Sequence, residues 1–426
     1  MPDLIKAAEE LYLYGFPLVV TEATHWGADD RKLSHLREFP TEKIKKVVRL
    51  NMDTLYSIGW TQLARTPYIA HIPKITERYY LFPIMDAYTN VVESIDTRTP
   101  DKAEGDYLLI LEGDNIPEGC ENYRVIRLKN SLNAVLLRIE TRGKADYTLA
   151  NSLQDKFEFR PVYEDRVIQS SHEAPESPAE YTENLSAKEF FEIFAELAKE
   201  NPITDERYEE YFSLFGRDKK TGSFDYDSLS EEQKNALEQG RNAALGIIRS
   251  GIRNNEYLVH RRGWFAITGG IGVYGNDYVQ RAQTAYGGWG ANIIEDSAYV
   301  AGVADDDGER LSNKHSYKLH FAPDGYPHAA VFWSVTLYGE PSRYPVPNPI
   351  DRFAINTYDL ENGNVRKNAD GSLDIYISKD APTGVAALNW LPAPTNEENF
   401  SLTIRIYYPD ELTIRGEWEP PSITKI

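Results

Sequence analysis

The chain has 426 residues and a formal charge of −20, with 41% hydrophobic and 12% aromatic residues. This length exceeds one ordinary core, so we expect two domains and a connector. The negative charge argues against a nucleic-acid partner, because a phosphate-binding surface needs clustered lysine and arginine and only short basic runs such as 43–46 occur. The 28 tyrosines suit half-buried strand faces and ligand grooves.

The sequence shows no pattern for export, membrane insertion or disulfide bonding. Its single cysteine, Cys120, excludes an intrachain disulfide. The first residues lack a basic leader with a long apolar run, and no stretch approaches about 18 uninterrupted apolar residues. We therefore expect a cytoplasmic protein with no membrane partner.

Strand patterns dominate the first domain, which we assign to residues 1–185. Asp3 caps a predicted short helix that we expect to end at Gly15 and Pro17. From about residue 45, runs rich in Val, Ile, Tyr and Thr alternate with Pro, Gly and Asp at the spacing of an all-β sandwich. The predicted strands are 68–72, 79–82, 107–111 and 134–139.

Helical patterns mark a connecting region at residues 186–300. The segment 186–189 has the sequence of a capping box and is followed by apolar residues at helical spacing. The segments 230–233 and 292–295 repeat this arrangement. We predict a helix after each of the three.

Strand patterns return in the last domain, residues 301–426. Asp370-Gly371 is a strong turn signal between two of the predicted strands. The predicted fold is therefore mainly β, with two β-sandwich domains and a helical middle segment. The predicted strands of this domain are 317–321, 329–337, 373–377 and 400–407.

Three patterns have weak support as cofactor sites. Residues 270–275 match a dinucleotide fingerprint, but the sequence around them does not predict alternating strands and helices, so we expect a hinge or tight packing. Residues 305–309 lack the register of a calcium loop and favour a hairpin turn. A three-histidine site of His315, His320 and His328 is disfavoured, because these positions alternate between sheet faces. We predict no metal and no nucleotide cofactor.

The segment 51–90 holds the polar residues that best suit chemistry, since polar groups among apolar neighbours are costly unless they are paired or functional. We predict that Asp53 and Asp86 face one cleft, with one carboxyl as acid and the other as base or orienting group. Tyr56 is the third predicted catalytic residue. Tyr88 and Asn90 are predicted to bind the substrate.

The alternative interpretation of this segment is structural. Asn51 and Asp53 precede a strand and can satisfy their own backbone in an Asx-turn. Ion pairs of the aspartates with Arg78, Arg98 or Arg138 would also make them structural.

Aromatic residues of the last domain form a second candidate binding surface. Trp333, Tyr338 and Trp390 either line a groove for a flat or sugar-like ligand or pack in the core. The alternation of large and small residues in 332–338 requires that one face of this strand is core.

The first half of the sequence resembles the family of domain of unknown function 1254. The motifs are Asn51-x-Asp53-Thr54-x-Tyr56, Arg78-Tyr79-Tyr80 and Asp86-x-Tyr88-Thr89-Asn90. The second half resembles the usual partner of that family, domain of unknown function 1214. Its motifs include Phe332-Trp333-Ser334-Val335-Thr336-x-Tyr338, Asn389-Trp390-Leu391-Pro392 and Arg405-x-Tyr407-x-Pro409.

This resemblance implies an immunoglobulin-like first sandwich, a helical middle and a C-terminal jelly roll, assembled as a homo-oligomer. Arg405, from the last motif, completes the predicted substrate-binding residues. The families have no assigned activity, so the resemblance adds more to the fold than to the function.

Three functions stay open at this point. The leading hypothesis is a soluble enzyme that acts on a small-molecule ligand by hydrolase- or lyase-type acid–base chemistry. The alternatives are a non-catalytic binder of a carbohydrate or aromatic compound and a structural or assembly protein. A closed pocket that holds Asp53 or Asp86 favours the enzyme, and an open groove lined by Trp333 or Trp390 favours the binder.

Overall fold

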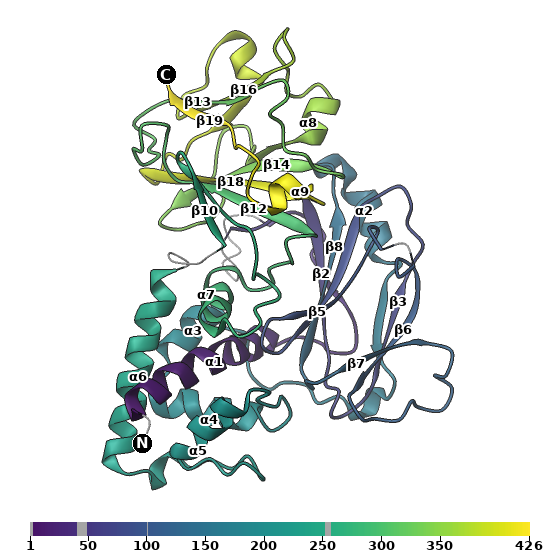
Figure 1. Cartoon of the computed structure of the whole chain (residues 1–426). Helices are drawn as coiled ribbons and strands as arrows, with labels where there is room; N and C mark the ends of the chain where they lie inside the picture. Colours follow the sequence, from purple (N-terminus) through teal and green to yellow (C-terminus); the bar gives the residue numbers. More distant parts are fainter. Residues whose placement is uncertain (1–2, 41–48, 100, 252–256) are drawn as a thin grey trace.

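Two sheet-rich halves and a helical region make up the molecule (Figure 1). The computed structural model describes residues 3–40, 49–99, 101–251 and 257–426. Within these residues the strands form four sheets, two from the first half of the chain and two from the second. The protein is therefore a mixed α/β molecule in which helices lie between the two halves in sequence.

The first half contains a five-stranded and a four-stranded sheet. The larger sheet has the order β1 (Ser34–His35), β2 (Thr54–Trp60), β8 (Asn133–Glu140), β4 (Tyr80–Asp86) and β5 (Val91–Asp96). The smaller sheet has the order β7 (Arg124–Leu128), β6 (Gly105–Leu111), β3 (Tyr68–Ile72) and β9 (Glu158–Pro161). Side chains alternate along β8, so Val135 and Leu137 join the core with β3 and β6, while Leu136 and Arg138 lie on the opposite face.

The second half repeats this arrangement with a six-stranded and a four-stranded sheet. The larger sheet has the order β10 (Leu258–Arg261), β11 (Trp264–Ile267), β12 (Ser297–Gly302), β18 (Asn399–Tyr407), β14 (Trp333–Glu340) and β15 (Ala354–Asn356). The smaller sheet has the order β17 (Trp390–Pro392), β16 (Leu373–Ser378), β13 (Tyr317–Phe321) and β19 (Ser422–Lys425). Leu402 and Ile404 of β18 join the core, and Thr403 and Arg405 lie on the opposite face.

Six helices pack together on one side of the larger sheet of the first half, whose Trp60 and Leu136 join their core. They are α1 (Leu4–His25), α3 (Pro178–Asn184), α4 (Ala187–Leu197), α5 (Glu206–Leu214), α6 (Glu231–Ser250) and α7 (Tyr278–Gly288). Three further helices are α2 (Tyr147–Gln154), α8 (Thr357–Glu361) and α9 (Glu411–Ile414). No helix in the described ranges has both the length and the apolar composition needed to cross a bilayer.

Several predicted elements are confirmed. The predicted strands 68–72 and 317–321 coincide with β3 and β13. Capping boxes at Ser186 and Ser230 begin α4 and α6, as predicted. The segment 305–309 is a tight turn in which the Asp305 N–H donates to the Glu309 carbonyl at 2.9 Å.

The prediction that the first helix ends at Gly15 and Pro17 is wrong, because α1 continues to His25. All residues from 11 to 20 are buried. A Cβ at Gly15 would lie 2.6 Å from Cδ1 of Phe194, so this glycine makes room for a ring of α4. Burial on every side outweighs the backbone hydrogen bond that Pro17 cannot form.

The helix predicted after 292–295 is also absent, and the chain there enters β12. The Asn292 amide donates to the Ser297 hydroxyl at 2.9 Å instead of capping a helix. The strands β10 and β11 lie inside the range 186–300, for which mainly helices were predicted, and β12 begins there. Antiparallel pairing with β18, more than 100 residues later in the sequence, decides the structure of this segment.

Candidate functional site

A cavity of about 1300 Å³ lies between the two halves. Tyr56 and Trp60 of β2 line it from the first half, and Tyr299 of β12 and Phe265 of β11 line it from the second. The end of α1 and the loop that carries Trp289 close it from the helical region. A concave site with mainly apolar walls and a few convergent polar groups is typical of small-molecule binding.

Two tyrosine–arginine pairs line the cavity, one from each half. Tyr56 and Arg138 are direct partners on β2 and β8, and Tyr299 and Arg405 are direct partners on β12 and β18. The guanidinium carbon of Arg138 lies 5.0 Å from the ring centre of Tyr56. That of Arg405 lies 5.6 Å from the ring centre of Tyr299. These cross-strand cation–π contacts orient both guanidinium groups.

Arg138 and Arg405 are buried, each with 3% of its surface exposed. Arg138 donates to the Gly290 carbonyl, while its Nε and Nη1 have no partner. Arg405 donates to the hydroxyls of Thr336 and Tyr338, at 3.1 and 2.8 Å, while its Nε has no partner. Among the described residues no carboxylate forms an ion pair with either arginine, which is unusual for a buried cation.

The surroundings of these two arginines raise the pKa of each, so both stay positively charged. Burial lowers the pKa of Arg138, but the neighbouring Tyr56 and Tyr299 raise it by a larger amount, so the net shift is upward. Burial likewise lowers the pKa of Arg405, and Tyr338 and nearby groups more than offset this effect. Both side chains are therefore cationic at every physiological pH.

The charged residues of the described lining are almost all basic. Glu38 is the one acidic residue among them. The five arginines are Arg49, Arg138, Arg310, Arg343 and Arg405. The net charge of the protein is −20, whereas the charged residues of this lining are mainly positive.

His35 of β1 and Tyr56 of β2 both line the cavity. His35 is the direct partner of Ser57, so its side chain leaves the sheet on the face opposite to that of Tyr56. Burial lowers the pKa of His35, so its imidazole is neutral at pH 7. Its Nδ1 lies 2.7 Å from the Ser57 hydroxyl, and in the tautomer that keeps a proton on Nδ1 the Nε2 lone pair is free. Burial raises the pKa of Tyr56, so its phenol stays protonated.

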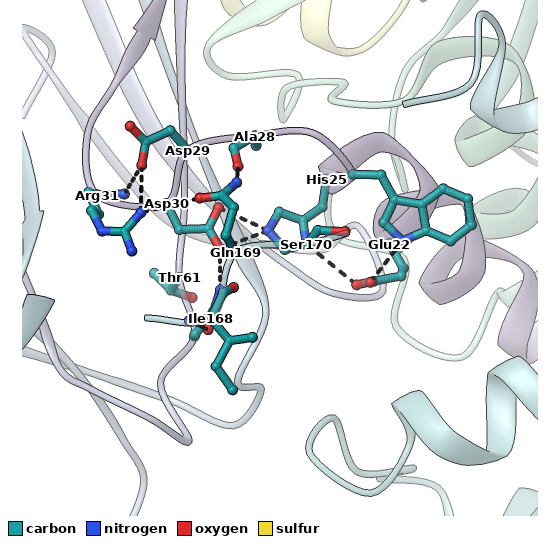
Figure 2. Close-up of polar contacts among 12 residues, drawn as sticks. Glu22, His25, Ala28, Asp29, Asp30, Arg31, Thr61, Ile168, Gln169 and Ser170 are labelled. Atoms are coloured by element: carbon teal, nitrogen blue, oxygen red, sulfur yellow. Dashed lines mark hydrogen bonds and ion pairs between the residues drawn. The ribbon is translucent and has the colours of Figure 1, made fainter. Parts of the chain in front are cut away.

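A buried histidine packs against a tryptophan of the cavity wall. Figure 2 shows His25, the last residue of α1, between Glu22 and Asp30, with Nε2 at 2.9 Å from Asp30 Oδ2 and Nδ1 at 3.5 Å from Glu22 Oε2. Its ring centre lies 5.1 Å from that of Trp60 in the cavity wall. Burial lowers the pKa of His25, but hydrogen bonds to Asp30 and Glu22 outweigh it and raise the pKa to about 9.

Tyr56 and Arg405 are the two predicted site residues that line the cavity. Asp53 lies outside the lining, with 1% of its surface exposed, and accepts hydrogen bonds from Ser334 at 2.6 Å and Tyr407 at 3.1 Å. Burial raises the pKa of Asp53.

Asp86, Tyr88 and Asn90 form the turn between β4 and β5, and none of them lines the cavity. The Asp86 carboxylate accepts from the backbone N–H groups of Tyr88 and Asn90, at 2.9 and 2.8 Å, and from the Asn90 amide. Tyr88 donates its phenol proton to the Asn201 carbonyl. In their described contacts these residues hold a turn together.

Trp333, Tyr338 and Trp390 also lie outside the cavity lining. Trp333 packs against Phe321 in the core of the second half. The indole of Trp390 donates to the Ser378 carbonyl at 3.0 Å. Tyr338 accepts a hydrogen bond from Arg405 and thereby helps to position a lining residue.

Two of the three arginines considered as partners for Asp53 and Asp86 form ion pairs elsewhere. Arg78 pairs with Asp146, and Arg98 pairs with Asp96 and Asp296. The third, Arg138, lines the cavity.

Two of the three histidines considered as metal ligands contact separate carboxylates. His320 and His328 bind Asp374 and Asp410, at 2.7 and 2.8 Å. In the described ranges no three His, Cys, Asp or Glu side chains are grouped as ligands for a metal ion.

Sequence reasoning did not identify His35, Arg138 and Tyr299 as ligand-binding residues. A signal for Arg138 is present, because it is the one charged residue in the apolar strand 134–139. A lone arginine on the strand of a buried sheet is costly unless it has a partner or a ligand. His35 and Tyr299 have no comparable signal in the sequence.

The fold is that of a β-rich protein of two sheet-rich halves with a cavity between them. The chain carries two family domains, each described as a protein of unknown function: DUF1254 at residues 31–161 and DUF1214 at residues 296–411. This confirms the resemblance seen in the sequence motifs.

Two solved structures are similar to this chain. The VPA0106 protein from Vibrio parahaemolyticus has a TM-score of 0.72 and 20% identity, with 100% of both chains covered, and shows a shared fold. An uncharacterised protein from Burkholderia cenocepacia has a TM-score of 0.47 and 12% identity, with 100% of this chain and 94% of that chain covered. Comparison with curated proteins gives no match.

Proposed function

We propose that the protein is an enzyme that acts on a small organic molecule in the cavity between its two halves. The observation that carries this proposal is that Tyr56, a protonated phenol, and His35, a neutral imidazole on the edge strand of the same sheet, both line one cavity of about 1300 Å³. A phenol that donates a proton and an imidazole that accepts one suit proton transfer of the hydrolase or lyase type when a ligand reaches both. The chemistry needs no metal or nucleotide.

This proposal changes the roles that we predicted for the carboxylates. His35 takes the place of Asp53 and Asp86 as the base, because both aspartates lie outside the cavity lining. Tyr56 keeps its predicted catalytic role as the acid. The aspartates then act as structural residues that bind hydroxyl and backbone donors.

A non-catalytic binder of an aromatic compound is the second candidate. The observation in its favour is the aromatic lining of the cavity by Trp26, Trp60, Phe265 and Trp289. Aromatic rings offer large contact areas to flat ligands.

The experiment starts with native mass spectrometry of the purified protein to identify any ligand that stays bound. That ligand is then incubated with the wild type and with His35→Gln, Tyr56→Phe and the control His71→Gln, and its mass is followed with time. His71 is partly exposed and pairs with Asp106, outside the cavity. An enzyme converts the ligand, about 100-fold more slowly in the first two variants and at the wild-type rate in the control.

The other outcomes are equally informative. A ligand that stays unchanged while bound one to one favours the binder. A cavity-filling variant, Leu136→Trp, tests whether binding occurs in this cavity at all, because Leu136 lines it. Ligand binding that is unaffected by this substitution would overturn both candidates.

We also propose the finer fold assignment, an immunoglobulin-like first sandwich and a jelly roll, and a homo-oligomeric assembly. The motifs of the two family domains support these proposals. The native mass spectrum gives the subunit count directly, and a large closed assembly would favour a structural role.

A further inference from the structure

We propose that Arg138 and Arg405 form an anion site inside the cavity, which binds the carboxylate or phosphate group of an otherwise apolar ligand. The inference rests on the proposed function, since it takes the cavity as the ligand site, and it names the class of ligand. One residue of the site comes from each half of the molecule.

The first argument is the unused hydrogen-bonding capacity of both arginines. Three guanidinium nitrogens, Nε and Nη1 of Arg138 and Nε of Arg405, are buried without a hydrogen-bond partner. An unsatisfied buried donor costs about 1–3 kcal/mol, and more for a charged group. A ligand oxyanion that accepts from these positions removes that cost, so binding is favoured beyond the attraction of the charges.

The second argument is the missing counter-charge. Of the three other arginines buried in the described ranges, Arg78 binds Asp146 and Arg217 binds Glu209, whereas Arg281, outside the cavity lining, has no ion pair there. Arg138 and Arg405 form no ion pair with a carboxylate among the described residues, although the buried Asp53 carboxylate interacts electrostatically with Arg405. A buried cation without a protein carboxylate is well suited to a carboxylate or phosphate supplied by a ligand.

The third argument is the contrast between the lining and the rest of the molecule. Among the described residues, five arginines, of which Arg49 pairs with Glu340, and one glutamate line the cavity of a protein with net charge −20. Apolar walls strengthen the field of these charges and raise the local concentration of small anions. The acidic exterior disfavours large polyanions such as nucleic acids, so the ligand is a small molecule.

The remaining lining determines the other part of the ligand. Trp60 and Trp289 stack with ring centres 5.7 Å apart, and Leu136 lies beside Arg138 on the same face of β8. An aromatic or aliphatic body fits these walls, with its anionic group at the arginines. The substrate class is therefore an amphipathic organic anion.

The test uses two fluorescent probes of similar shape, 8-anilinonaphthalene-1-sulfonate, which is anionic, and N-phenyl-1-naphthylamine, which is neutral. The dissociation constant of each is measured for the wild type, Arg138→Met, Arg405→Met and Arg281→Met. Arg281 is a matched control, because it is also buried, has an unpartnered Nε and no ion pair among the described residues, but lies outside the cavity lining.

We expect Arg138→Met and Arg405→Met to weaken binding of the anionic probe about 10- to 100-fold. Binding of the neutral probe changes less than about twofold, because its apolar contacts remain. Arg281→Met leaves both affinities unchanged. Equal affinity of the wild type for both probes, or equal losses for both probes in the variants, would overturn the anion site.

A measurement on the wild type keeps the test decisive if a variant does not fold. Displacement of the anionic probe is compared for 4-phenylbutyrate, phenyl phosphate and the neutral 4-phenylbutyramide. Displacement by either anion at concentrations at least about tenfold lower than the amide supports the site and distinguishes a carboxylate from a phosphate ligand. Equal displacement by all three contradicts it. Failure of both fluorescent probes to bind refutes the proposed cavity function instead, so the two failures are distinguishable.

Discussion

The Ser334 hydroxyl donates to the Asp53 carboxylate at 2.6 Å, across the boundary between the two halves of the molecule. Tyr407 donates to the same carboxylate at 3.1 Å and accepts from the Asn51 amide at 2.7 Å. Asn51 and Asp53 belong to the motifs of the first domain, and Ser334 and Tyr407 to those of the second. This buried network therefore joins the motifs of the two family domains, and it explains why polar residues occur among apolar neighbours there.

The network predicts a structural phenotype for Asp53. Asp53→Ala leaves two buried hydroxyl groups without their acceptor, so we expect the free energy of unfolding to fall by about 2–4 kcal/mol. Asp53→Asn keeps an acceptor oxygen and costs about 1 kcal/mol. Urea denaturation at neutral pH measures both changes.

A surface aspartate serves as the control for this prediction. Asp106→Ala removes an exposed carboxylate that pairs with His71, and we expect a change below about 0.5 kcal/mol. If Asp53→Asn abolished activity and left unfolding unchanged, Asp53 would regain a role in proton transfer.

His25 predicts a specific dependence of stability on pH. Its pKa is raised to about 9 in the folded protein, from an ordinary value of 6.5, because Asp30 and Glu22 stabilise the imidazolium. The stability that comes from this shift is fully present below pH 6.5 and is lost as the pH rises through about 9. The shift corresponds to about 3 kcal/mol.

The measurement compares the wild type with His25→Gln. The difference in unfolding free energy between them should be largest near pH 6 and should shrink by about 3 kcal/mol towards pH 10. His71→Gln, at a partly exposed position, should show no such trend. A wild-type curve parallel to that of His25→Gln would show that the pKa of His25 is the same in the folded and unfolded states.

The proposed base, His35, has an opposite shift that can be measured without a substrate. Burial lowers its pKa below 6.5, with a further contribution from Arg37. We expect the imidazole signal that disappears in His35→Gln to titrate below pH 6.5 in an NMR experiment. The rate of the proposed reaction should then fall as the pH drops below that pKa, because the base becomes protonated.

A different titration would remove His35 from its role. An imidazole that titrates above pH 6.5 is partly charged at neutral pH and is a poorer base. Ser57→Ala removes the hydroxyl at 2.7 Å from Nδ1 and separates the effect of burial from that of the hydrogen bond. If burial dominates, the pKa stays low in this variant.

The strands that could be predicted from the sequence are those whose own residues carry a strand pattern. Residues 317–321 alternate apolar and polar side chains, and residues 68–72 are a short run rich in strand-forming residues; both were predicted with the observed bounds. The capping boxes at Ser186 and Ser230 are equally local, since each depends on residues three apart.

The cavity could not be predicted in this way, because it depends on pairings between distant residues. Tyr56 meets Arg138 through β2 and β8, and Tyr299 meets Arg405 through β12 and β18. No local pattern gives these registers. The predicted site was centred on Asp53 and Asp86 because polar residues near turns are conspicuous, whereas a lone arginine within an apolar strand, such as Arg138, is the better indication of this cavity.

Two glycines of α6 predict opposite effects of the same substitution. A Cβ at Gly240 would lie 2.5 Å from the backbone nitrogen of Glu9 and from the Cβ of Ala8, where α1 crosses α6. Gly240→Ala must push the two helices apart and should lower the free energy of unfolding by about 1–3 kcal/mol. At Gly246 a Cβ would have no neighbour within 4 Å, so Gly246→Ala should raise the free energy of unfolding by about 0.5–1 kcal/mol through helix propensity alone. Urea denaturation of both variants checks the prediction, and an increase in the free energy of unfolding for both would show that α1 and α6 are not in close contact in solution.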